Sequence, residues 1–113
     1  METTIEVKIK ATSPCARFLE CSHREQIQKI KEEVLEVEEA IEVFLKDGQT
    51  IEQKEEAAIA VLAEMYDVVA CVNTLCKQLT HRHPMYFNKA TRDVAETVVV
   101  NKNMARGYYA PEV

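Results

Sequence analysis

The sequence predicts an all-α fold: an antiparallel helix bundle of two long helices and a third, C-terminal helix, completed by oligomerisation. Apolar residues recur every three or four positions from Ile27 to Phe44, the period of a helix with one packing face. A second stretch, from about Glu55 to Leu79, is apolar on nearly every side, and such a helix is normally buried. Because only a short turn joins the two, we expect them to lie antiparallel. With 113 residues, the chain fits a single helical domain over residues 1–113.

The N-terminal residues do not follow the helical pattern. From Thr4 to Lys10, apolar and charged residues alternate with the period of a strand, but no partner strand is visible in the sequence. We therefore expect residues 1–14 to form an extended or poorly ordered arm. A short helix is predicted after Pro14, over residues 16–20, presenting Phe18 and Leu19.

Local capping signals place the two long helices. Ser22 and Glu25 form an S-x-x-E capping box that starts the first helix, and Asp47-Gly48 ends it. Thr50 and Gln53 repeat the capping pattern at the start of the second helix. The turn between the helices is therefore short.

A third helix is predicted from Asn88 to Ala105. His83-Pro84 precedes it and disfavours a continuous helix at this point. Gly107 provides the stop signal. Val94 and Val98 are four residues apart and are expected on the inner face of this helix.

Composition narrows the classes of function and location. The net charge is −5, and no basic cluster is longer than His81-Arg82-His83, which argues against a nucleic-acid partner. Residues 57–76 are long enough to span a bilayer, but Glu64 and Asp67 near their middle argue against a membrane location. The N-terminus has no continuous apolar signal segment, and the four cysteines form no C-x-x-C pair. A cytoplasmic protein with reduced cysteines is expected.

The second helix carries two carboxylates where a core helix would hold apolar residues. Glu64 and Asp67 are one turn apart and so face the same way. Burying each unpaired ion costs on the order of several kcal/mol. No Lys or Arg lies between Lys54 and Lys77, so the counter-charge must come from elsewhere: a basic side chain or a divalent metal.

The first helix offers a second acidic pair, Glu33 and Glu36, on one flank of its apolar stripe. If the antiparallel neighbour turns Glu64 and Asp67 toward that flank, four carboxylates converge and require cations. Hard divalent cations, above all Mg²⁺, match an all-oxygen site. A Glu-rich helix is also common as a solvated face. The remaining acids of the first helix are expected to form such a face: Glu32, Glu38, Glu39 and Glu42.

The two acidic motifs together resemble a known family. The segments EEVLEVEEAI at residues 32–41 and EMYDVVACV at residues 64–72 resemble the all-α nucleoside triphosphate pyrophosphohydrolases, the MazG-like proteins and their relatives the dimeric dUTPases. Their signature is E-x-x-E on one helix and E-x-x-D on the next. Glu33/Glu36 and Glu64/Asp67 match it, although Glu36/Glu39 and Glu39/Glu42 also spell E-x-x-E.

This resemblance implies an activity and a cofactor. The four matched carboxylates would hold Mg²⁺, for which Mn²⁺ can substitute, against the triphosphate of an NTP or dNTP substrate. A metal-activated water would attack the α-phosphorus and release nucleoside monophosphate and pyrophosphate, as in house-cleaning of the nucleotide pool. Glu32 or Glu33 is our candidate for the group that orients or deprotonates the water. Lys102 and Arg106 match cations that contact phosphates in the family.

Other roles remain open for the substrate-binding candidates. Lys102 and Arg106 could instead complement the C-terminal end of the third helix. Asn73 could read a sugar or base edge, or donate a hydrogen bond to backbone. Tyr66 and Phe18 could stack on a base, although aromatic residues at such positions more often belong to the core. A damaged base, a standard deoxynucleotide and dUTP would all present the same triphosphate.

The apolar surface of the predicted helices indicates that the protein self-associates. Three helices leave too little chain to cover the apolar second helix, so a homodimer or homotetramer is expected. The strongest competitor to an enzyme is a non-catalytic oligomerisation or adaptor module whose acids pair with Arg or Lys across an interface. A di-iron bundle is disfavoured because the chain has no E-x-x-H motif. Magnesium-dependent pyrophosphate release would exclude the adaptor.

Overall fold

The computed structural model describes residues 10–109, and these residues are helical without strands. A 3-10 turn, η1 (Ala16–Phe18), is followed by three α-helices: α1 (His23–Leu45), α2 (Ile51–Arg82) and α3 (Lys89–Ala105). The predicted all-α class and the three longer helices are confirmed. Residues 1–9 of the arm predicted over residues 1–14 lie outside the described residues. Residues 10–13 of that arm are not extended but form a turn, in which the N–H of Ser13 donates to the Lys10 carbonyl at 2.9 Å.

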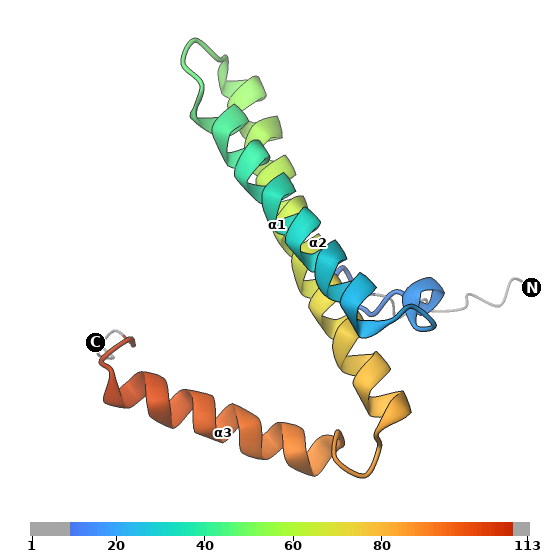
Figure 1. Cartoon of the computed structure of the whole chain (residues 1–113). Helices are drawn as coiled ribbons and strands as arrows, with labels where there is room; N and C mark the ends of the chain where they lie inside the picture. The colour runs from blue at the N-terminus through green and yellow to red at the C-terminus, as the bar shows by residue number, and fades with distance from the viewer. Residues whose placement is uncertain (1–9, 110–113) are drawn as a thin grey trace, which may run out of the picture. The chain divides into compact units, whose positions relative to one another are not determined.

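The chain divides into two compact units, Met1–Gln78 and Leu79–Val113, each described here by itself. In the first unit, α1 and most of α2 lie side by side (Figure 1). The Gln26 side chain, near the start of α1, donates a 2.9 Å hydrogen bond to the carbonyl of Cys71 in the later half of α2. At the other end, the Lys54 ammonium donates to the Phe44 carbonyl.

The capping residues predicted from sequence start both long helices. The Ser22 hydroxyl accepts from the backbone N–H of Glu25 at 3.1 Å. Thr50 and Gln53 form a reciprocal capping box, with hydrogen bonds of 2.9 and 3.1 Å. Gly48 has a φ of +79°, the left-handed conformation that glycine adopts at little cost, and it turns the chain between the helices.

Polar side chains of α2 hold the segment that precedes α1. The Thr74 hydroxyl accepts from the backbone N–H of Cys15 at 2.9 Å. Gln78 donates to the carbonyl of Phe18 at 2.7 Å. Both side chains are fully buried, although neither residue is apolar. The segment from Cys15 to Phe18 is thus fixed on α2 by hydrogen bonds to its backbone.

A single chain covers little of its apolar surface. The buried hydrophobic residues among those described are Ala57, Ala70 and Cys71. Ile59 and Leu62, in the middle of α2, are 66% and 56% exposed. The sequence predicted that a single chain would leave α2 partly uncovered, and these exposures agree with that; burial of α2 by further copies stays a prediction. Among the described helices, α2 is the one that is long and apolar enough to cross a membrane. Core helices of soluble proteins meet the same criterion of length and composition.

The second unit contains α3. Asn88 caps its first turn by accepting from the N–H of Thr91 at 3.1 Å. At its end, Gly107 has a φ of +70°, and the N–H groups of Gly107 and Tyr108 return to carbonyls of α3 in a Schellman motif. Val94 and Val98 are 64% and 56% exposed, and their packing on an inner face of the helix stays a prediction.

Candidate metal centre

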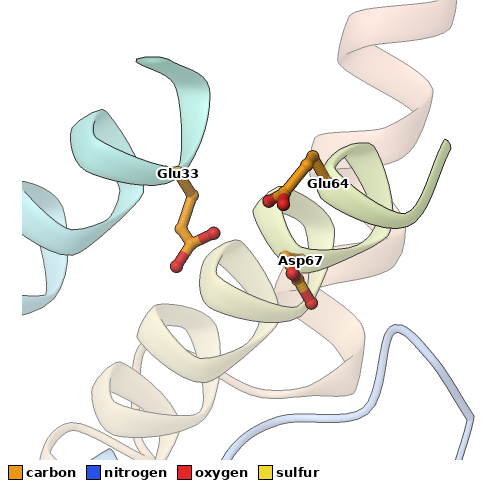
Figure 2. A group of neighbouring side chains, drawn as sticks. All are labelled: Glu33, Glu64 and Asp67. Atoms are coloured by element: carbon orange, nitrogen blue, oxygen red, sulfur yellow. The ribbon is translucent and has the colours of Figure 1, made fainter. Parts of the chain in front are cut away.

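Three carboxylates from α1 and α2 converge in the first unit. Glu33 on α1 faces Glu64 and Asp67 on α2 (Figure 2). One oxygen from each side chain can be chosen so that all three lie within 4.8 Å of one another. Glu64 and Asp67 share a face of α2 because they are three residues apart. We refer to Glu33, Glu64 and Asp67 as the acidic cluster.

The acidic cluster has one basic neighbour among the described residues. Lys29 lies one turn before Glu33 on α1, and its Nζ is 3.3 Å from Glu33 Oε1. The hydrogen bond from Lys29 to Glu33 is the main reason that the pKa of Lys29 is raised. The Glu33 side chain is 13% exposed, whereas that of Lys29 is 35% exposed. The ion pair therefore lies at the edge of the cluster.

Two oxygens of the acidic cluster have no partner. Glu33 Oε2 and Glu64 Oε2 are buried and accept no hydrogen bond. Leaving a buried charged acceptor unsatisfied is costly, and several carboxylates this close repel one another. Carboxylate oxygens are the ligands that Mg²⁺ and Mn²⁺ prefer. The donor set and its two unsatisfied atoms therefore fit a hard divalent cation.

A thiol next to the acidic cluster does not change the preference of the site for a hard divalent cation. Cys71 lies on α2, one turn after Asp67, and is buried. Burial, and then the negative charge of Glu33, raise the pKa of the Cys71 thiol. Because a metal-binding cysteine must be a thiolate, this protonated thiol gives no reason to expect a soft metal.

The other acids proposed from the sequence lie outside the acidic cluster. Glu36, the predicted fourth ligand, is exposed. Glu32, one of the two candidate bases, is also exposed and lines a pocket of about 310 Å³ beside Lys29. Glu39 and Glu42, which offered other registers of the E-x-x-E motif, are exposed as well. Of the four predicted ligands, Glu33, Glu64 and Asp67 are the three that meet.

The substrate-binding candidates occupy different surroundings. Phe18 lines the same pocket as Glu32 and Lys29. Tyr66 is 52% exposed on α2. The Asn73 amide donates to the carbonyl of Thr12 at 2.7 Å, so the backbone role considered for it from sequence is present.

Lys102 and Arg106 belong to the second unit, whereas the acidic cluster lies in the first. Arg106 caps the end of α3, with its N–H directed to the Lys102 carbonyl at 3.1 Å. Its guanidinium carbon is 5.7 Å from the centre of the Tyr108 ring.

Sequence reasoning missed Lys29 and three buried polar residues, Gln26, Thr74 and Gln78. The Lys29 pair was visible as an i,i+4 spacing to Glu33, since such residues are neighbours on a helix.

No known protein family, curated protein or solved structure matches the chain. The acidic cluster is therefore the feature that bears most directly on function.

Proposed function

We propose that the chain is a MazG-like, magnesium-dependent nucleoside triphosphate pyrophosphohydrolase that converts an NTP or dNTP to the monophosphate and pyrophosphate. One observation carries the proposal: Glu33, Glu64 and Asp67 meet with two buried oxygens unsatisfied. These are three of the four positions of the E-x-x-E and E-x-x-D motifs. Such an activity would serve house-cleaning of the nucleotide pool in the cytoplasm.

The proposed roles of the acids follow from their surroundings. Glu33, Glu64 and Asp67 would hold Mg²⁺ or Mn²⁺, and the exposed Glu36, one turn after Glu33, would be the fourth ligand. When bound, the cation would neutralise phosphoryl oxygens and lower the pKa of a water molecule. Glu32 or a Glu33 oxygen not engaged by the cation would accept a proton from that water.

Substrate contacts are proposed for residues outside the acidic cluster. Lys102 and Arg106 would contribute positive charge to the phosphates. The Phe18 ring and the exposed Tyr66 ring would offer flat apolar surfaces to a base. Asn73 would hydrogen-bond a sugar or base edge through its side-chain carbonyl or its second amide hydrogen, because the first amide hydrogen already binds the Thr12 carbonyl.

We also propose that two or four copies complete an antiparallel helix bundle. The support is the exposure of large apolar side chains along α2, including Ile59, Leu62 and Met65. Contiguous apolar surface of this kind usually marks an interface. The same observation favours the second candidate function, a non-catalytic oligomerisation module. However, Glu33 of the acidic cluster is already paired within the chain, by Lys29, rather than left for an interface partner.

A panel of NTPs and dNTPs, each incubated with protein and Mg²⁺, tests the proposal. At least one substrate should yield monophosphate and pyrophosphate, with activity lost in EDTA and restored by Mg²⁺ or Mn²⁺. Glu64→Gln should be inactive, whereas Glu38→Gln, on the exposed face of α1, should retain activity. Release of nucleoside diphosphate and orthophosphate would show that the wrong bond was assigned. A wild-type protein that is inactive on the whole panel would favour the oligomerisation module.

A further inference from the structure

Lys29 already supplies positive charge to the acidic cluster. Its Nζ is 3.3 Å from Glu33 Oε1. This is the one ion pair that reaches the cluster among residues 10–109. A single ammonium cannot balance three carboxylates, and it leaves Glu33 Oε2 and Glu64 Oε2 unsatisfied. A divalent cation that binds Glu33 would therefore meet a carboxylate that is already paired with Lys29.

Two effects of Lys29 on cation binding oppose each other. By donating to Glu33, Lys29 orients a ligand, and loss of such outer partners typically weakens metal binding by about 10–100-fold. By its charge, Lys29 repels a cation a few ångströms away. Solvent screens part of this repulsion, because the Lys29 side chain is 35% exposed, but a divalent ion feels it twice as strongly as a monovalent ion.

The surroundings of Lys29 favour its repulsion of the cation over its orienting effect on Glu33. The Glu33 side chain is only 13% exposed, so its burial restricts its orientation even when Lys29 does not hold it. The ammonium also has a second place to go, because Nζ is 5.3 Å from the centre of the Phe18 ring, within the range of a cation–π contact. Lys29 and Phe18 line the same pocket of about 310 Å³. Lys29 can therefore release Glu33 without losing every favourable contact.

We propose that Lys29 is a resident counter-ion of the acidic cluster that competes with the divalent cation and keeps the affinity for the bare cation low. The inference rests on the proposed function, because it concerns the same cation site. A triphosphate would bring the negative charge needed to satisfy the cation and Lys29 together. The site would then favour a cation–triphosphate complex over the cation alone.

Binding of Mn²⁺ alone, followed by electron paramagnetic resonance of the free ion, tests this role without activity. Lys29→Gln removes the charge but keeps a hydrogen-bond donor, and it should bind Mn²⁺ at least about tenfold more tightly than wild type. Lys29→Arg retains the charge and should stay within about twofold of wild type. Lys31→Gln, an exposed position on the same helix, makes the same change in net charge and should also stay within about twofold.

The outcomes separate this inference from the proposed function. If wild type binds Mn²⁺ and Lys29→Gln binds it equally or more weakly, Lys29 is not a competitor and the inference fails alone. If wild type and all variants fail to bind Mn²⁺, the metal site and the inference fail together. Circular dichroism checks that each variant is folded, and Lys29→Met repeats the test if the glutamine variant is not.

Discussion

At the scale of single residues, the acidic cluster combines opposing demands. Glu64 and Asp67 repel each other on one helix, while Glu33 Oε2 and Glu64 Oε2 lie buried without donors. Glu33 and Glu64 are half-buried, whereas Asp67 is exposed, so the burial of both α2 carboxylates expected from sequence is wrong for Asp67. The two buried oxygens without donors still make the site costly for stability alone. The arrangement is understandable if a cation supplies the missing charge.

Neutralising one of these carboxylates should stabilise the cation-free chain and abolish turnover. Glu64→Gln or Asp67→Asn removes a like-charge neighbour one turn away, which should raise the free energy of unfolding by about 0.5 kcal/mol. Thermal unfolding in EDTA, with Glu38→Gln as the exposed control, measures the first effect. A variant that kept near-normal turnover would show that its side chain is not a metal ligand.

The buried thiol of Cys71 makes stability depend on pH. Burial and the charge of Glu33 raise its pKa in the folded chain, so the folded state holds this proton more tightly than the unfolded state. The resulting stabilisation is complete below the unfolded pKa, about 8.5, and is lost as pH rises through the folded pKa. Denaturant unfolding between pH 7.5 and 9.5 should show this loss, and Cys71→Ala should reduce it. An identical slope in the two proteins would contradict the assignment.

At the scale of elements, local signals were predictable and distant ones were not. Ser22, Thr50, Asn88 and Gly107 each mark a helix end through atoms a few residues away, and each was identified from sequence. Thr74 and Gln78 bind backbone groups 59 and 60 residues away, so no spacing in the chain indicates their role. Helical spacing placed both Glu33 and Glu36 on one flank of α1 and predicted that they would meet Glu64 and Asp67 if α2 turned that way. Glu33 meets them, whereas Glu36 is exposed and lies outside the acidic cluster.

The hydrogen bond between α2 and the N-terminal segment should contribute measurably to stability. Thr74→Val keeps the shape but leaves the backbone N–H of Cys15 without its acceptor, which should cost about 1–3 kcal/mol. Thr74→Ser should recover most of that loss. Thr97→Val, at an exposed position of α3, serves as the control and should change stability by less than about 0.5 kcal/mol. Chemical denaturation gives these values, and equal losses at both threonines would contradict the account.

At the scale of the whole molecule, apolar surface exceeds what one chain covers. The sequence predicted that α2 needs more than one neighbouring helix. It did not predict which face of α2 another copy would occupy, because that depends on side chains of the other copy. An apolar pocket of about 260 Å³ lies between α1 and α2, and its lining includes Ile41, Phe44 and Leu62. Leu62 is 56% exposed at this position.

A charge at this pocket should break self-association. Wild type should elute as a dimer or tetramer in size-exclusion chromatography with light scattering. Leu62→Lys would place an ammonium in the apolar interface and should shift the protein toward monomer. Glu38→Lys, on the exposed face of α1, should leave the assembly intact. A stable, well-folded wild-type monomer at micromolar concentration would contradict the proposed assembly and weaken the family assignment.

The central claim is that the acidic cluster directs a cation-dependent attack on the α-phosphorus. Phosphorus-31 NMR of the reaction in ¹⁸O-labelled water, on a substrate found active in the nucleotide panel, measures this most directly. We expect the label in the nucleoside monophosphate, unlabelled pyrophosphate as the second product, and no reaction in EDTA or with Glu64→Gln. Label in pyrophosphate or orthophosphate, or label in the monophosphate with Glu64→Gln fully active, would contradict the claim.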